Sequence, residues 1–342
     1  MGEFDLIERF FKRPAAAAVV GIGDDCAILQ PRPGRQLAVS SDMLVQGQHF
    51  FADVDPETLG HKALAVNLSD LAACGAQPFA FTLALALPTV EADWLQDFST
   101  GLFTLAQQHG CELVGGDTTR GPMNICITVL GEIDPAAGSA LLRSGAQADD
   151  DIYVSGHTGD ARLALDALRG RITLPPDLLA QTRQRLERPA PRVALGLALR
   201  GVASAAIDIS DGLLGDLGHV LAASGVGATI DTAAAMALLQ CDGSQLAPLL
   251  GTDRLLGCVL AGGDDYELLF TAPPTSRAAV AAASATSNTP ITRIGRIDAA
   301  TGLRLVDARG QPVANRFASF DHFAHFAHAA SATAAQEQHD DR

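Results

Sequence analysis

The sequence predicts a mixed α/β (α+β) protein with two domains. In both halves of the chain, short apolar segments typical of strands alternate with longer amphipathic segments typical of helices. Glycines and acidic residues recur where one type of segment gives way to the other. The length of 342 residues is that expected for about two domains, and the 48% of hydrophobic residues is enough for a large core.

The elements of the first half follow from apolar periodicity and end signals. Strands are expected over 36–44, 79–87, 111–119 and 124–133, and helices over 4–12, 55–76 and 91–109. The first strand is expected to end at Asp42, and the third to run into a glycine turn. Asp55 is in position to cap the long helix, and Gly75 to end it. Helical spacing places Asn67 and Asp70 on the same face of that helix.

The second half repeats the alternation. We expect residues 149–168 to form a strand, a glycine turn and a helix, and residues 188–200 to form a helix. Residues 203–224 are expected to form a strand, a turn at 208–211 and a helix. Further strands are expected over 227–233, 266–273 and 291–297. The predicted N-terminal domain is 1–137 and the C-terminal domain 149–326. Residues 327–342 are Ala-rich and polar, and we expect a disordered tail there.

The net charge restricts the classes of partner that the chain is expected to bind. The formal net charge is −15, from 24 basic and 39 acidic residues. Such a surface disfavours nucleic acid or an anionic membrane as a partner, and favours cations or anions that bind together with cations. The N-terminus lacks the apolar core of a signal peptide, and the longest apolar stretch, 79–87, is too short to span a bilayer. We therefore expect a soluble cytoplasmic protein.

Acidic residues stand beside glycines at the ends of several apolar segments. The pattern occurs in GIGDDCAIL (21–29), SSDML (40–44), GGDTTRG (115–121), DISDGL (208–213) and AGGDDYELLF (261–270). Neighbouring carboxylates repel one another, and partial burial is unfavourable without a cation. Any one of these aspartates is equally well explained as a helix cap or turn residue. Their repetition where strands end favours a shared ligand site, because ligands of open α/β sheets collect there.

The ligand types predict a site for magnesium and phosphate. Oxygen ligands without matching His or Cys indicate Mg²⁺ or Ca²⁺, and no EF-hand loop is present. Mg²⁺ normally takes one or two carboxylates, several waters and substrate phosphates. Many acids beside glycine turns therefore predict several Mg²⁺ ions that bind together with a nucleotide. The GxxxxGK[ST], GxGxxG and protein-kinase motifs are all absent, so the phosphate site is of another type.

A set of motifs in a fixed order carries a family resemblance. GIGDDCA, SSDMLVQGQHF, HKALAVNLSDLAACGAQP, GGDTTRGP, LLRSGA, IDISDGL and GGDDYELLF are followed by SFDHF near the end. Together they resemble the thiamine-monophosphate kinases of the aminoimidazole-ribonucleotide-synthetase-like superfamily, from Gly2 to about Phe323. The resemblance implies a two-domain fold in which the N-terminal α/β domain binds ATP and Mg²⁺ and pairs two chains into a homodimer. It also implies direct, in-line, Mg²⁺-assisted phosphorylation of thiamine monophosphate to thiamine diphosphate, with no protein nucleophile.

The resemblance also implies roles for residues at matching positions. The implied Mg²⁺ ligands are Asp25, Ser40, Ser41, Asp42, Asp70, Asp117, Asp208 and Asp211. The implied ATP contacts are Gly116, Asp117, Arg143 and Ser210. The implied contacts to thiamine monophosphate are His49, Asp264 and Phe320. The chain departs from the family pattern at Asp264, where Glu is usual.

Two alternatives stay open at this point. One is another ATP-dependent enzyme of the same superfamily, such as an aminoimidazole ribonucleotide synthetase or a selenophosphate synthetase. The other is a noncatalytic module that binds a nucleotide or a divalent cation. Release of ADP in the presence of thiamine monophosphate separates them from the kinase. Lys62, within the long helix, is expected to be a helix-surface charge.

Overall fold

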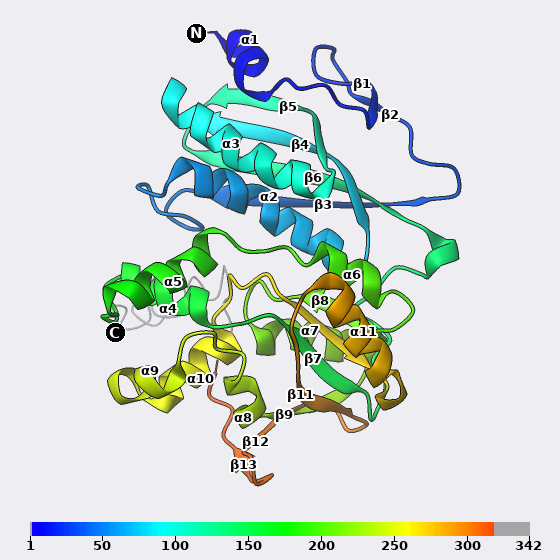
Figure 1. The fold of residues 1–342 in the computed structure, drawn as a ribbon, viewed down its shortest axis with the longest axis vertical. Helices are drawn as coiled ribbons and strands as arrows, with labels where there is room; N and C mark the ends of the chain where they lie inside the picture. The colour runs from blue at the N-terminus through cyan, green and yellow to red at the C-terminus, as the bar shows by residue number, and fades with distance from the viewer. Residues whose placement is uncertain (1, 318–342) are drawn as a thin grey trace, which may run out of the picture.

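The computed structural model describes residues 2–317, which form a mixed helix-and-sheet fold with two main sheets (Figure 1). The predicted fold class is confirmed. The predicted tail, 327–342, and Phe320 lie outside the described residues. No helix within 2–317 has the length and apolar character needed to cross a membrane.

The first sheet contains four strands and is covered by helices on one face. Its strands are β3 (Gln36–Val45), β4 (Gln77–Leu87), β5 (Glu112–Arg120) and β6 (Asn124–Ile133), in the order β3-β6-β4-β5. Helices α2 (Pro56–Ala73) and α3 (Ala92–His109) pack on this face. The predicted caps of α2 are confirmed, because the Asp55 carboxylate accepts the Thr58 N–H at 2.9 Å and Gly75 takes a φ of +65°.

Two strands run further than the sequence predicts. β3 does not end at Asp42 but continues to Val45, fully paired with β6. β5 does not turn at its glycines but continues through them to Arg120, parallel to β4. The reason is a close approach: a Cβ on Gly116 would overlap the backbone of Leu83. The glycines therefore serve strand pairing rather than a turn.

The N-terminal segment also differs from the prediction. In place of one helix over 4–12, the chain forms α1 (Glu3–Leu6) and a π-helical turn, η1 (Ile7–Phe11). This places Leu6, Phe10 and Phe11 together in the core. A two-stranded ladder of β1 (Ala18–Val20) and β2 (Ile28–Leu29) follows.

The second sheet contains seven strands. They are β7 (Asp151–Ser155), β8 (Ala205–Asp208), β9 (Gly227–Asp231), β10 (Leu268–Ala272), β11 (Ile291–Asp298), β12 (Gly302–Val306) and β13 (Pro312–Val313), in the order β13-β12-β9-β11-β7-β10-β8. The helices of this half are α4 (Asp160–Leu168), α5 (Pro176–Glu187), α6 (Val193–Leu199), α7 (Leu213–Ser224), α8 (Thr232–Met236), α9 (Gly243–Leu250), α10 (Thr252–Ala261) and α11 (Arg277–Ser287). Every element predicted for this half is present; helices α5 and α8–α11 and strands β12 and β13 were not predicted.

Helix α2 joins the two halves, as it lies between the first sheet and the elements of the second half (Figure 1). It packs against α3 and β6 on one side and against α6 and β8 on the other. The backbones of α2 and α6 are in close contact, since a Cβ on Gly196 would overlap the carbonyl of Ala72. Most of the circumference of α2 is therefore buried, and its polar residues are held between the two sheets.

The α2–α3 contact generates a stability prediction. A methyl group at Gly60 would overlap the carbonyl oxygen of Phe98, so Gly60→Ala should lower the free energy of unfolding by about 2 kcal/mol or more. Gly218, inside α7, has open space around its Cα, and Gly218→Ala should stabilise the protein by about 0.5–1 kcal/mol. Urea unfolding of both variants checks the pair. Equal effects at the two positions would show that helix spacing does not depend on Gly60.

Candidate active site

A cavity of about 270 Å³ at the junction of the two halves brings together half of the predicted site residues. Its walls come from β3, α2, α4, the loop between β8 and α7, and the loop before β10. The predicted residues that line it are Asp42, His49, Asp70, Asp208, Ser210, Asp211 and Asp264. We call it the acidic cavity. Segments far apart in the sequence thus place five carboxylates around one space.

Strand β3 and helix α2 hold the first part of this cluster. Ser40 and Asp42 alternate onto the face of β3 that meets α2. The hydroxyl of Ser40 donates to the Asp70 carboxylate, and the side-chain oxygen of Asn67 accepts the Asp42 N–H at 3.0 Å. The predicted common face of Asn67 and Asp70 is what makes both contacts possible.

The loop after β8 holds the second part. Asp208 is buried at the end of β8, and Ser69 of α2 donates to its carboxylate at 2.7 Å. One carboxylate oxygen of Asp216 accepts the backbone N–H groups of Ser210, Asp211 and Gly212, at 3.1–3.2 Å. Asp216 thereby fixes the loop that presents Ser210 and Asp211. Asp216 is not among the predicted site residues, although an acid in the first turn of the helix after DISDGL was the available signal.

The carboxylates of the cluster raise one another's pKa values. Burial, with the charges of Asp70 and Asp211, raises the pKa of Asp42 to about 6. Burial, followed by the Asp70 charge, raises the pKa of Asp208 to about 7. Burial also raises the pKa of Asp70, against the hydrogen bond from Ser40 and the charge of Arg143. Such a site is unfavourable at neutral pH until a cation neutralises it.

The arrangement fits a hard cation that arrives with phosphate. Within residues 2–317, no three acidic, imidazole or thiol groups converge into a complete metal cage. Mg²⁺ does not need one, because it keeps several waters and takes phosphate oxygens beside one or two carboxylates. Asp42, Asp70, Asp208 and Asp211 are available for this role from three different segments.

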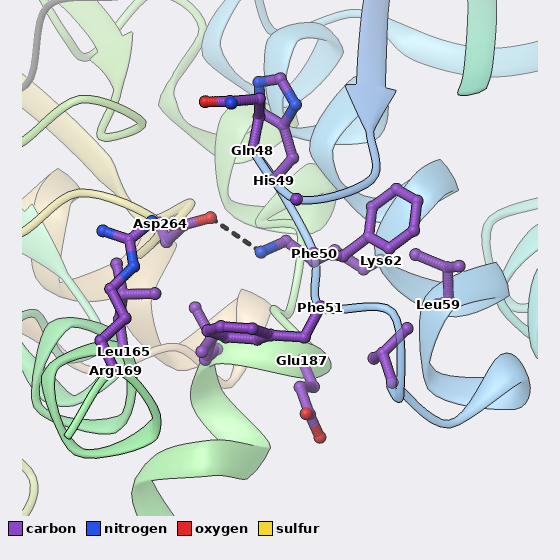
Figure 2. Close-up of a pocket in the computed structure, with 13 residues that line it drawn as sticks. Gln48, His49, Phe50, Phe51, Leu59, Lys62, Leu165, Arg169, Glu187 and Asp264 are labelled. Atoms are coloured by element: carbon purple, nitrogen blue, oxygen red, sulfur yellow. Dashed lines mark hydrogen bonds and ion pairs between the residues drawn. The ribbon is translucent and has the colours of Figure 1, made fainter. Parts of the chain in front are cut away.

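A second cavity, smaller and mostly apolar, is shown in Figure 2 and adjoins the first through shared lining residues. Its apolar wall consists of Phe50, Phe51, Val54, Leu59, Leu165 and Leu186, and we call it the apolar cavity. The two cavities share the residues of their common boundary: Gln48, His49, Leu165, Arg169 and Asp264. A ligand with a flat apolar part and an anionic part can therefore lie across both.

Lys62 is not the surface charge that the sequence predicted. Its side chain is 5% exposed, and its ammonium group donates to Oδ1 of Asp264 at 2.8 Å (Figure 2). The pair forms part of the boundary between the two cavities. Asp264 lies there with a φ of +61°, a conformation that Asp adopts more readily than most residues. Its N–H donates to the carbonyl of Ser210, which joins this boundary to the acidic cluster.

His49 lies at this boundary, and a hydrogen bond defines the tautomer of its neutral ring. Its Nδ1 accepts the backbone N–H of Val45 at 2.9 Å. In the neutral ring the proton is therefore on Nε2, which can donate to a ligand. The bend after β3 thus presents a fixed hydrogen-bond donor.

The wall of the apolar cavity is anchored by a buried carboxylate. Glu267, 0% exposed, accepts from Arg185 of α5 at 2.7 Å and from Arg192 before α6, and also from Ser155 at 2.6 Å. These contacts fix α5, and with it Leu186, against the start of β10. Glu267 is not among the residues for which the sequence predicts a role.

The other predicted residues lie elsewhere. Ser40 and Arg143 line a cavity of about 280 Å³ that shares Asp70 and Asp208 with the acidic cavity, so Arg143 adjoins the cluster from outside. Asp25, Gly116 and Asp117 are exposed and line a separate, larger cavity between β5 and the N-terminal segment. Ser41 points to the other face of β3, where its hydroxyl contacts that of Thr128 at 2.5 Å.

Comparison with known proteins identifies the family of this chain. Residues 23–133 match the model of the AIR synthase related protein, N-terminal domain, and 164–308 match that of the C-terminal domain. The thiamine-monophosphate kinase of Salmonella typhimurium is 46% identical over 94% of this chain and 98% of its own length. The chain belongs to the thiamine-monophosphate kinase family.

Solved structures agree with this membership. A crystal structure of thiamine-monophosphate kinase from Stenotrophomonas maltophilia superposes with a TM-score of 0.78 at 45% identity, and covers 91% of this chain and 96% of the other. A structure described as "AaThiL complexed with AMPPCP and TMP" superposes with a TM-score of 0.73 at 28% identity, and covers 86% and 89%. The thiamine-monophosphate kinase fold thus extends over both halves of the described chain.

The acidic cluster generates a pH prediction. A carboxyl group with a higher pKa in the folded than in the unfolded chain binds its proton more tightly when folded, so stability falls as pH rises. For Asp42 the loss begins at about pH 4 and is complete above about pH 6. In EDTA, Asp42→Asn should therefore gain roughly 2 kcal/mol relative to wild type between pH 4 and pH 8. Unfolding curves at both pH values test this, and a stability difference that does not change with pH would contradict it.

Proposed function

We propose that this protein transfers the γ-phosphoryl group of ATP to thiamine monophosphate, giving ADP and thiamine diphosphate. The observation that carries the proposal is the family membership, with 46% identity over 94% of the chain, together with a relative described in complex with AMPPCP and TMP. The adjoining apolar and acidic cavities support it, because thiamine monophosphate combines flat rings with a phosphate.

The two cavities suggest how the acceptor lies. The pyrimidine and thiazolium rings occupy the apolar cavity, between Phe51 and Leu186, and the phosphate points toward the acidic cavity. Asp264 keeps Oδ2 for the substrate because Lys62 occupies Oδ1. His49 offers its Nε2–H at the same boundary. Phe320, the third predicted contact, lies outside the described residues.

We further propose that Mg²⁺ binds at the acidic cluster, where Asp42, Asp70, Asp208 and Asp211 would hold it. The family resemblance also implies Ser40, Ser41, Asp25 and Asp117 as ligands, but Ser41 lies on the other face of β3, and Asp25 and Asp117 line a separate cavity. The implied ATP contacts are Gly116, Asp117, Arg143 and Ser210. Bound Mg²⁺ would neutralise phosphate charge and help to align the donor and acceptor oxygens. The loop held by Asp216 presents Ser210 and Asp211 to the phosphates.

The transfer needs no protein nucleophile or base. The acceptor phosphate already carries nucleophilic oxygens, so alignment and charge neutralisation are the main requirements. His49 holds its proton on Nε2 through the contact with Val45, which suits a hydrogen-bond donor rather than a base. The reaction is therefore a direct in-line transfer. Because it consumes ATP, we place the protein in the cytoplasm.

Turnover tests the proposed activity. The protein should release ADP from ATP and Mg²⁺ only when thiamine monophosphate is added, with thiamine diphosphate as the second product. Asp42→Asn keeps the size of the side chain and removes its charge, so turnover should fall by about 100-fold or more. Asp97→Asn, at an exposed position of α3, is the matched control and should retain full turnover. Nucleotide binding without ADP release in the wild type would favour the noncatalytic module.

We also propose that two chains pair through the first sheet. The face of β3 opposite α2 exposes Leu37, Val39 and Met43, which are 48%, 61% and 54% exposed. A row of apolar residues on an uncovered sheet face favours a protein interface.

Sedimentation velocity tests the pairing. The wild type should sediment with the mass of two chains, and Val39→Arg should give single chains, because a buried unpaired charge opposes association. Leu249→Arg, on the exposed side of α9 in the other half, should leave the dimer intact. A wild-type monomer at micromolar concentration, or a dimeric Val39→Arg, would contradict the proposal.

A further inference from the structure

Arg169 has a position that the proposed function does not yet use. It directly follows α4, where its backbone N–H donates to the carbonyl of Leu165 and caps the helix. Its side chain lines both the acidic and the apolar cavity, at the boundary that also contains His49 and Asp264 (Figure 2). Arg169 is thus a cation at the point where the two cavities meet.

The other charged groups near this boundary already have partners. Lys62 pairs with Asp264, Arg162 with Asp166, and Glu187 with Arg183. Among residues 2–317, Arg169 has no ion pair with any carboxylate. In a chain of net charge −15, a cavity-lining arginine without such a pair is available to an anion of the ligand.

The surroundings of Arg169 add to the local positive charge. Asp166 of α4 is approached by three arginines: Arg162 at 3.1 Å, Arg171 at 3.4 Å and Arg254 at 3.6 Å. One carboxylate cannot balance three guanidinium groups, but of the three only Arg162 lines the acidic cavity. Helix α4 and the residue after it thus bring two arginines, Arg162 and Arg169, to the wall of the cavity that also holds the carboxylate cluster. An anion bound in this cavity can contact Arg169 as well as a cation held by the cluster.

The shape of the site indicates which anion of the ligand lies beside Arg169. The organic half of the acceptor fits the apolar cavity, and the transferred group must come from the acidic cavity. The acceptor phosphate then lies at their boundary, beside Arg169. A guanidinium group suits this task, because its planar set of donors matches phosphate oxygens two at a time.

We propose that Arg169 is a specificity-determining residue that binds the phosphate of thiamine monophosphate and so distinguishes it from unphosphorylated thiamine. The inference rests on the proposed function and adds a contact to it. Arg169 restrains the acceptor phosphate at the boundary of the two cavities, and its charge offsets part of the repulsion between two phosphate groups brought together for transfer.

Paired binding measurements test the inference on the full chain. Calorimetric titrations with thiamine monophosphate and with thiamine, both in Mg²⁺, are compared for wild type and Arg169→Gln. The variant should bind thiamine monophosphate at least about tenfold more weakly, with thiamine affinity unchanged. Arg169→Lys should recover part of the loss, because it keeps the charge without the planar fork. Arg171→Gln is the control, as Arg171 lines neither cavity, and it should change neither affinity.

Steady-state kinetics give a second readout, which also decides the matter where thiamine binds too weakly to measure. Arg169→Gln should raise the KM for thiamine monophosphate about tenfold or more and leave the KM for ATP unchanged. An equal loss of both thiamine ligands, an increased KM for ATP, or no change at all would overturn the inference. If the wild type turns over thiamine monophosphate and the variant matches it, only the role of Arg169 fails. If the wild type neither binds nor phosphorylates thiamine monophosphate, the proposed function fails with it.

Discussion

The packing of α2 between the first sheet and the second half of the chain is the contact on which the site depends. One side of this helix holds Asp70 against β3, and another holds Ser69 against Asp208 at the end of β8. A shift of α2 along either neighbour would separate these carboxylates. The small residues Gly60 and Gly196, at close helix contacts, leave little room for such a shift. The helix therefore sets the geometry of the site as well as the distance between the halves.

Repulsion and burial within the acidic cluster lower the stability of the folded chain, and the surrounding hydrogen bonds offset part of this loss. Ser40 and Ser69 donate to two of the carboxylates, and backbone groups fix the loop that carries Asp211. The fold holds the charges in place without neutralising them fully, so a cation bound there would meet carboxylates that are already positioned. This is the usual relation between a preorganised polar site and the ligand that completes it.

The sequence predicted features that depend on local chemistry. The caps of α2, the common face of Asn67 and Asp70, and the turn after β8 follow from residue type and spacing, which act within a few residues. Lys62 could not be placed this way, because its partner Asp264 lies 202 positions away and only the folded chain brings them together. The continuation of β5 through its glycines depended on the neighbouring strand β4 for the same reason. Asp25 and Asp117 resembled the clustered acids in sequence, yet the fold places them in another cavity.

The ion pair between Lys62 and Asp264 has a consequence for which molecules this chain would accept. Because the ammonium and the carboxylate balance each other, the wall that they form carries no net charge toward the apolar cavity. The positively charged thiazolium ring of thiamine would then gain little from attraction to this wall, and its fit would depend on ring thickness and on the hydrogen bonds at the rim. Uncharged ring analogues of the same outline, carrying the same phosphate, are therefore a natural starting point for competitive inhibitors of this protein.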